Sequence, residues 1–186
     1  MIYTDKKRQS IRLKNYDYSK SGLYFVTICT ENRECLFGDI IDGKMVLNNA
    51  GNMIEKMWNK IPERFNVVKL DESQIMPNHV HGIIIIKSNN VGVSFMKPEI
   101  KITITKSNHH MGLINQTPTL GLIIRYFKSK CTYEIHKNGF NNDLWQRNYY
   151  KHVIRREFDL NKIREYINTN PQMWERDRNN PKYKNE

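Results

Sequence analysis

The sequence predicts an α+β fold in which the strands of one antiparallel sheet alternate with helices inside a single domain. Short runs rich in β-branched and aromatic residues recur along the chain, and longer segments between them place apolar residues at helical spacing. The 186 residues, 39% of them hydrophobic, suffice for one core and leave little for a second.

The first part of the chain predicts a strand, a hairpin and a helix. Residues 22–32 (GLYFVTICTEN) are dense in β-branched and aromatic side chains, which is typical of a central strand. Asp42-Gly43 stands between two short apolar runs, the strongest local indication of a hairpin. A helix is expected from Asn48 to about Pro62, with Asn48 or Asn49 as its cap, because apolar residues recur at helical spacing: Met53, Ile54, Met57, Trp58 and Ile61.

The middle of the chain predicts two more strands, a loop and a second helix. The strands, 65–76 and 79–86, are separated by a turn at Pro77-Asn78. Residues 87–116 are rich in Ser, Asn, Lys and Gly and are expected to form a variable loop. The helix begins at Thr117 or Thr119 and carries one apolar face: Leu120, Ile123, Ile124, Phe127 and Cys131.

A fourth strand over 143–154 and a third helix over 157–171, which must end by Pro171, complete the expected elements. The order strand, helix, strand, strand, helix, strand is the ferredoxin-like βαββαβ pattern. Here a hairpin is inserted after the first strand and a helix follows the last. We therefore predict an antiparallel sheet with helices on one face.

The chain is strongly basic, with 30 Lys and Arg against 19 Asp and Glu, a formal net charge of +11 and a pI near 9.6. Such a charge favours a polyanionic partner, first of all nucleic acid, over a small metabolite. A basic arm over 1–20 is expected to precede the domain at 21–172, and a charged tail over 173–186 to follow it.

Other features concern the cellular compartment. No apolar run approaches the ~18 residues of a membrane-spanning helix, and the N-terminus is charged where a signal peptide would be apolar. We expect a soluble, cytoplasmic protein with no membrane partner. Three cysteines without a CxxC pair, Cys29, Cys35 and Cys131, are expected to be reduced structural thiols.

The stretch MPNHVHGIIII places two histidines at the head of an aliphatic strand. Side chains alternate along a strand, so His79 and His81 share one face and lie close together. Two neutral imidazoles side by side can chelate one divalent cation. The alternative is structural: two histidines at the wet end of a half-buried strand.

The third helix carries a second group of polar residues. Leu160, Ile163 and Ile167 make its apolar stripe, and Tyr166 and Asn170 lie beside the edge of that stripe, one turn apart. A partly exposed phenol could there meet a substrate while the amide oxygen reaches a metal. Alternatively, Tyr166 is a tyrosine at the core boundary and Asn170 caps the helix before Pro171.

Several motifs together resemble the one-tyrosine HUH transposases, specifically the branch of REP-associated tyrosine transposases. Along the chain they are RQSIRLKNYDYSKSGLYFVTICTENRECLFG, MPNHVH, IIRYFKSKCT, LWQRNYYKHVIR and YINTNP, in the order expected for that family. The resemblance runs from about Arg8 to Trp174. The combination of HxH after MPN, then WQR, then YIxxNP is specific.

The resemblance implies that His79 and His81 are the metal-binding HUH histidines and that Tyr166 is the nucleophile. Asn170 would be the third metal ligand, with His152 as a rival. The implied reaction cleaves and rejoins single-stranded DNA through a 5′-phosphotyrosine, with Mg²⁺ or Mn²⁺ as cofactor and hairpin (REP-like) DNA as substrate. Related dimers exchange the tyrosine helix between subunits, so monomer and homodimer both stay open.

A set of basic side chains is expected to follow the DNA backbone: Arg12, Lys14, Arg125, Lys128, Lys130, Arg147, Lys151 and Arg155. One alternative is a catalytically inactive nucleic-acid-binding protein of the same fold. Another is a metal-dependent phosphoesterase that uses water as the nucleophile. That class normally needs several acidic ligands, and the nearest acids before the histidine pair in sequence are Asp71 and Glu72.

Overall fold

The computed structural model describes residues 21–87, 118–137, 139 and 142–183. The expected basic arm over 1–20, with Arg12 and Lys14, lies outside the described residues. So does almost all of the expected loop over 87–116. Among the described helices, none is both long and apolar enough to cross a membrane.

The core of the fold is a four-stranded antiparallel sheet with strand order β4–β5–β1–β6. The strands are β1 (Gly22–Cys29), β4 (Val68–Met76), β5 (His79–Ile86) and β6 (Tyr150–Ile154). The helices α1 (Asn49–Asn59), α2 (Ile61–Arg64) and α3 (Leu120–Lys137) connect them, and α4 (Glu157–Thr169) follows the last strand. This arrangement confirms the predicted ferredoxin-like α+β fold.

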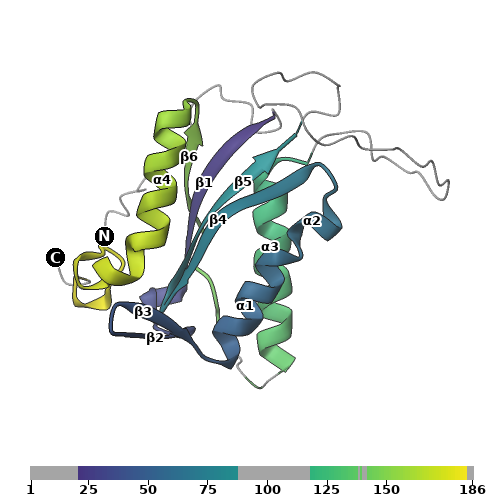
Figure 1. Ribbon diagram of the computed structural model, residues 1–186. Coiled ribbons are helices and arrows are strands. Elements are labelled where there is room, and N and C mark those ends of the chain that lie inside the picture. The colour runs from purple at the N-terminus through teal and green to yellow at the C-terminus, as the bar shows by residue number, and fades with distance from the viewer. Residues whose placement is uncertain (1–20, 88–117, 138, 140–141, 184–186) are drawn as a thin grey trace, which may run out of the picture.

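The sheet is covered on both faces, with α1 and α3 on one side and α4 on the other (Figure 1). The prediction of helices on one face was therefore wrong for α4. Both faces of the central strands are apolar: Tyr24 and Val26 join the core under α1 and α3, whereas Phe25 and Ile83 point to α4. An apolar second face needs a cover, which Leu160 and Ile167 of α4 supply.

Two local predictions are confirmed in detail. The hairpin pairs β2 (Gly38–Ile41) with β3 (Lys44–Leu47). Its turn residues Asp42 and Gly43 have φ values of 50° and 70°, the left-handed conformation that a tight type I′ turn requires. At the start of α1, the side chain of Asn48 accepts a 2.9 Å hydrogen bond from the backbone N–H of Gly51.

The fourth strand is shorter than predicted, since β6 begins at Tyr150 rather than near residue 143. The residues before β6 do not form a continuous strand with β1. Trp145 makes an isolated bridge with Thr30, and the Gln146 N–H donates a 3.0 Å hydrogen bond to the Cys29 carbonyl. Lys128 of α3 donates to the carbonyls of Gln146 and Asn148, so this segment lies against α3.

The expected charged tail over 173–186 does not describe this segment, because residues up to Tyr183 are folded. Two 3₁₀ helices follow α4, η2 (Asn170–Arg176) and η3 (Pro181–Tyr183). Asp177, Asn179 and Asn180 are buried between them. Some of their polar groups bond inside the protein, for example Asn180 Nδ2 to the Trp174 carbonyl at 3.0 Å, so a polar composition here accompanies burial.

Candidate active site

The two histidines of β5 lie on the face of the sheet that α4 covers, and both side chains are buried. Their Nε2 atoms are 2.9 Å apart. Gly82, which follows His81, explains how β5 can pack so closely against α1. A Cβ atom on Gly82 would stand 2.2 Å from Cζ2 of Trp58, so only glycine lets the strand rest directly on this α1 side chain.

Neighbouring side chains orient both imidazoles. Asn78 donates its amide N–H groups to the carbonyls of Arg33 (2.9 Å) and Asn179 (2.8 Å), which leaves its Oδ1 as an acceptor. His79 Nδ1 lies 2.8 Å from this oxygen and therefore carries the proton, so that Nε2 keeps its lone pair. On His81, Nδ1 lies 2.9 Å from the Thr27 hydroxyl, which can donate or accept.

Burial keeps both imidazoles neutral. It lowers the pKa of His79 to about 3, and the positive charge of Arg178 acts in the same direction. It also lowers the pKa of His81 well below its usual value, with the neighbouring His79 as the next cause. At neutral pH both rings can therefore offer nitrogen lone pairs to a cation.

A carboxylate that sequence reasoning missed completes this cluster. Asp177 Oδ2 lies 3.7 Å from His79 Nε2 and has no hydrogen-bond partner among the described residues, although it is buried. The ligand atoms of His79, His81 and Asp177 all lie within 4.8 Å of one another, close enough for one ion. No local pattern indicated Asp177, because it belongs to the segment expected to be a tail.

Tyr166 reaches the same cluster from α4. Its hydroxyl lies 3.3 Å from His81 Nε2, and its side chain remains 43% exposed, so a substrate can reach it. Burial raises the pKa of the Tyr166 phenol, and the negative charge of Asp177 raises it further. Arg178 and a hydrogen bond with the Asn170 side chain lower it.

The two expected alternatives for a third ligand lie in different places. Asn170 is buried at the end of α4, and its Oδ1 has no hydrogen-bond partner among the described residues. His152 is exposed on β6, opposite Phe25, and does not join the cluster of His79 and His81. The structure thus brings Asn170 to Tyr166 and leaves His152 on the surface.

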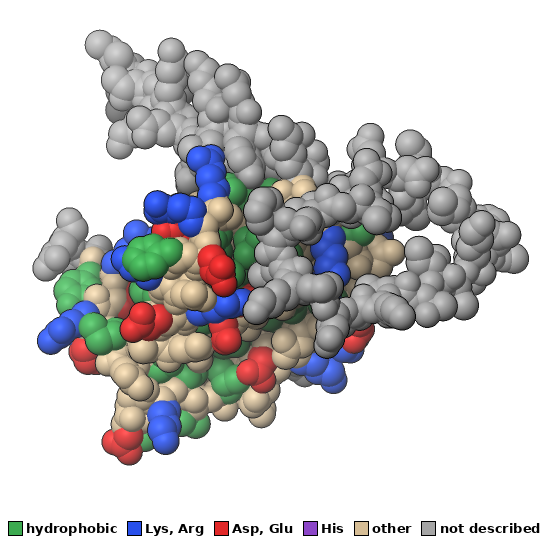
Figure 2. Space-filling model, turned by 45° about the horizontal axis from the view of Figure 1, so that its top comes forward, with side chains coloured by type: hydrophobic (Ala, Val, Ile, Leu, Met, Phe, Trp, Pro, Cys, Tyr) green, Lys and Arg blue, Asp and Glu red, His purple; other side chains and the backbone are tan. Residues whose placement is uncertain are grey.

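The basic residues expected to follow DNA are spread over the described part of the chain. Arg125, Lys130, Arg147 and Arg155 are exposed, and Lys151 lies 5.6 Å from the Tyr149 ring. Figure 2 shows Lys and Arg side chains mixed with acidic and apolar ones over the visible face. The sequence did not single out Arg178, whose guanidinium lies 5.4 Å from the Tyr150 ring and whose charge acts on the site.

No family model matches the chain. Its sequence is 44% identical over 170 residues, 91% of both chains, to an uncharacterised protein of Haemophilus influenzae. Its structure aligns with that of a REP-associated tyrosine transposase bound to a REP hairpin, with a TM-score of 0.55 and 18% identity over 86% of this chain and 72% of the other. The chain therefore belongs to the same family as the Haemophilus influenzae protein and shares the fold of a REP-associated tyrosine transposase.

Proposed function

We propose that the protein is a metal-dependent endonuclease and strand transferase of single-stranded DNA, with Tyr166 as its nucleophile. One observation carries this proposal: the Tyr166 hydroxyl lies 3.3 Å from a buried pair of neutral imidazoles. A tyrosine that acts as a nucleophile forms a covalent bond to phosphorus and thereby conserves the phosphodiester energy for rejoining. The net charge of +11 supports a polyanionic substrate.

The residues present fit a divalent cation such as Mg²⁺ or Mn²⁺. His79 and His81 would hold it through Nε2, Asp177 through Oδ2 and Asn170 through Oδ1. Both oxygens are buried without a hydrogen-bond partner among the described residues, which is costly unless a ligand satisfies them. When bound, the cation would polarise the scissile phosphate and offset the charge that develops on its oxygens.

The chain's own groups account for the remaining chemistry. Tyr166 Oη bonds to phosphorus as the bond to the 3′-oxygen breaks, which yields a 5′-phosphotyrosine and a free 3′-hydroxyl. The phenol loses one proton in this step and the leaving 3′-oxygen takes one up. The charge of Arg178 and the hydrogen bond with Asn170 favour the phenolate, whereas burial and the charge of Asp177 oppose it. Attack of a 3′-hydroxyl on the phosphotyrosine reverses the step and joins the strands.

For the substrate we propose DNA with a hairpin beside the cleaved strand. This rests on the motifs shared with REP-associated tyrosine transposases and on a solved transposase of the same fold that binds a REP hairpin. The mass of the protein in solution, measured with and without this DNA, tests whether the protein acts as a monomer or a dimer.

The test is incubation of the purified protein with Mn²⁺ or Mg²⁺ and labelled single-stranded DNA from the flanks of its own gene, followed by denaturing gel electrophoresis. We expect a protein–DNA adduct that EDTA prevents and that Tyr166→Phe abolishes. Tyr150→Phe is a matched control, because Tyr150 is equally exposed, at 42%, and lies in the same region near Arg178. An adduct that persists in Tyr166→Phe would refute the assignment of the nucleophile.

Asp177 also supports a second candidate function, a phosphoesterase that activates water. One acidic ligand of the several that such an enzyme normally uses lies beside the histidines in the structure, although no acid stands next to them in sequence. In the same assay this enzyme would cleave DNA without forming an adduct, and Tyr166→Phe would still cleave. Binding without any cleavage would instead favour an inactive nucleic-acid-binding protein.

A further inference from the structure

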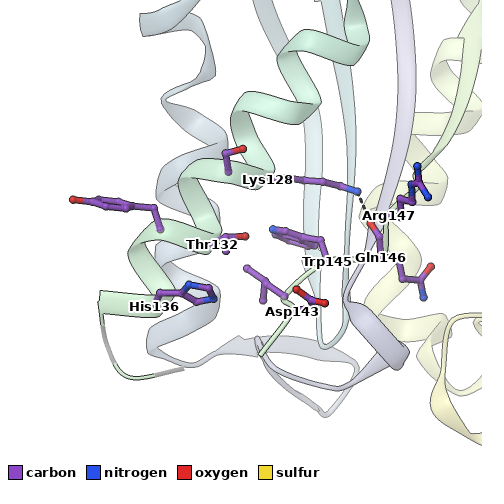
Figure 3. A pocket seen from close by; sticks show the side chains of 10 residues that line it. Lys128, Thr132, His136, Asp143, Trp145, Gln146 and Arg147 are labelled. Carbon is purple, nitrogen blue, oxygen red and sulfur yellow. Dashed lines mark hydrogen bonds between the residues drawn. The ribbon is translucent and has the colours of Figure 1, made fainter. Parts of the chain in front are cut away.

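A pocket of about 470 Å³ lies between α3 and residues 143–147, outside the histidine cluster (Figure 3). Gln146 lines this pocket and also a smaller hollow of about 170 Å³. The smaller hollow includes Thr27, which contacts His81. The two spaces therefore share Gln146 as a lining residue.

Three hydrogen-bond donors line the pocket along α3 and Trp145. The indole Nε1 of Trp145 is buried without a hydrogen-bond partner among the described residues, and Figure 3 shows the nitrogen-bearing edge of this ring turned toward α3. The Lys128 ammonium has three N–H groups and donates to the carbonyls of Gln146 (2.7 Å) and Asn148 (3.1 Å). Its third N–H has no hydrogen-bond acceptor among the described residues. The Thr132 hydroxyl projects toward the indole nitrogen, whereas the Lys128 ammonium lies farther along, beside Gln146.

The pocket also presents an acceptor. Lys128, Thr132 and His136 follow at four-residue spacing on one side of α3, and Figure 3 shows them projecting toward the segment with Asp143 and Trp145. His136 Nε2 lies 3.4 Å from the Asn142 carbonyl. Asp143 is exposed, and its carboxylate can accept hydrogen bonds from an exocyclic amino group of a base.

We propose that this pocket binds one nucleotide of the single-stranded DNA substrate, with its phosphate at the Lys128 end and its base at Asp143. A cation, a hydroxyl and an indole N–H suit a phosphodiester, whereas a carboxylate would repel it. The same carboxylate favours cytosine over thymine, which has no amino group. This inference rests on the proposed function, since it names a further contact with the same substrate.

The test measures binding alone, by fluorescence anisotropy in EDTA, with labelled oligo(dC) and oligo(dT) of about 20 nucleotides, longer than one binding module covers. We expect the wild-type protein to bind oligo(dC) about fivefold more tightly, as one base contact allows. Asp143→Ala should bring this ratio near one without weakening oligo(dT). Thr132→Val should weaken both about fivefold, because it removes one donor and keeps the shape.

Asp39→Ala is the matched control, because it removes one exposed acid on β2, outside the pocket, and should leave the ratio unchanged. A wild-type ratio of one, or a ratio that Asp143→Ala leaves intact, overturns the subsite. The Tyr166 adduct assay is read separately. If the protein forms the adduct but Asp143→Ala keeps the wild-type preference for oligo(dC), the subsite alone is refuted. If Asp143→Ala abolishes that preference but the wild-type protein forms no adduct, the tyrosine chemistry alone is refuted.

Discussion

The buried histidine pair should make the metal-free protein sensitive to mild acid. The pKa of His79 is about 3 in the folded protein and 6.5 without the fold. Between these values the unfolded chain binds more protons, so the free energy of unfolding falls as the pH drops through 6.5 toward 3. Above pH 6.5 His79 is neutral in both the folded and the unfolded state, so this loss of stability is absent.

The size of this effect follows from the shift. One proton corresponds to about 1.4 kcal/mol per pH unit, so at pH 5, about 1.5 units below 6.5, His79 alone lowers the free energy of unfolding by about 2 kcal/mol. His81, whose pKa is shifted in the same direction, adds to the loss. This is a large part of the 5–15 kcal/mol, in round numbers, of a typical domain.

The assay is urea unfolding of the protein in EDTA at steps from pH 7 to pH 5, where carboxylates with ordinary pKa values remain charged. His79→Gln should lower the slope of the free energy of unfolding against pH, whatever its effect on stability at pH 7. Exposed His152→Gln is the control and should leave the slope unchanged. A wild-type protein that is equally stable at both ends, or an unchanged slope in His79→Gln, would refute this reasoning.

Three further predictions concern the surroundings of the site. Gly82→Ala should destabilise the protein by about 3 kcal/mol in urea unfolding, because its Cβ would overlap Trp58 at 2.2 Å, and a smaller residue at 58 should recover part of the loss. Arg164→Ala removes two hydrogen bonds to Asp71 (2.7 and 2.6 Å) and should cost about 1 kcal/mol above pH 5. Since Arg164 holds the pKa of Asp71 below its usual value, this cost should fade as the pH drops below 3.8. Mn²⁺ at about 100 times its Kd should raise the free energy of unfolding by about 2.7 kcal/mol. In thermal unfolding at a fixed Mn²⁺ concentration, Asp177→Asn should reduce this stabilisation. An equal stabilisation in the variant would exclude Asp177 as a ligand.

Local patterns in the sequence determined the strands, the helices and part of the site. Strand alternation placed His79 and His81 on one face, and helical spacing placed Tyr166 and Asn170 one turn apart. The order of the elements determined the ferredoxin-like sheet, because few antiparallel topologies fit it. These features depend on residues close together in the chain, which is why the sequence alone reveals them.

Tertiary packing decided the rest. The sequence did not indicate that α4 would cover the second face of the sheet, nor that the residues after it would bring Asp177 and Arg178 to the histidines. It also did not show that Asn78 would hold the Asn179 carbonyl and so join these distant segments at 2.8 Å. Such contacts depend on how whole elements pack, and a polar, charged segment looks the same in sequence whether water or a buried histidine pair satisfies it.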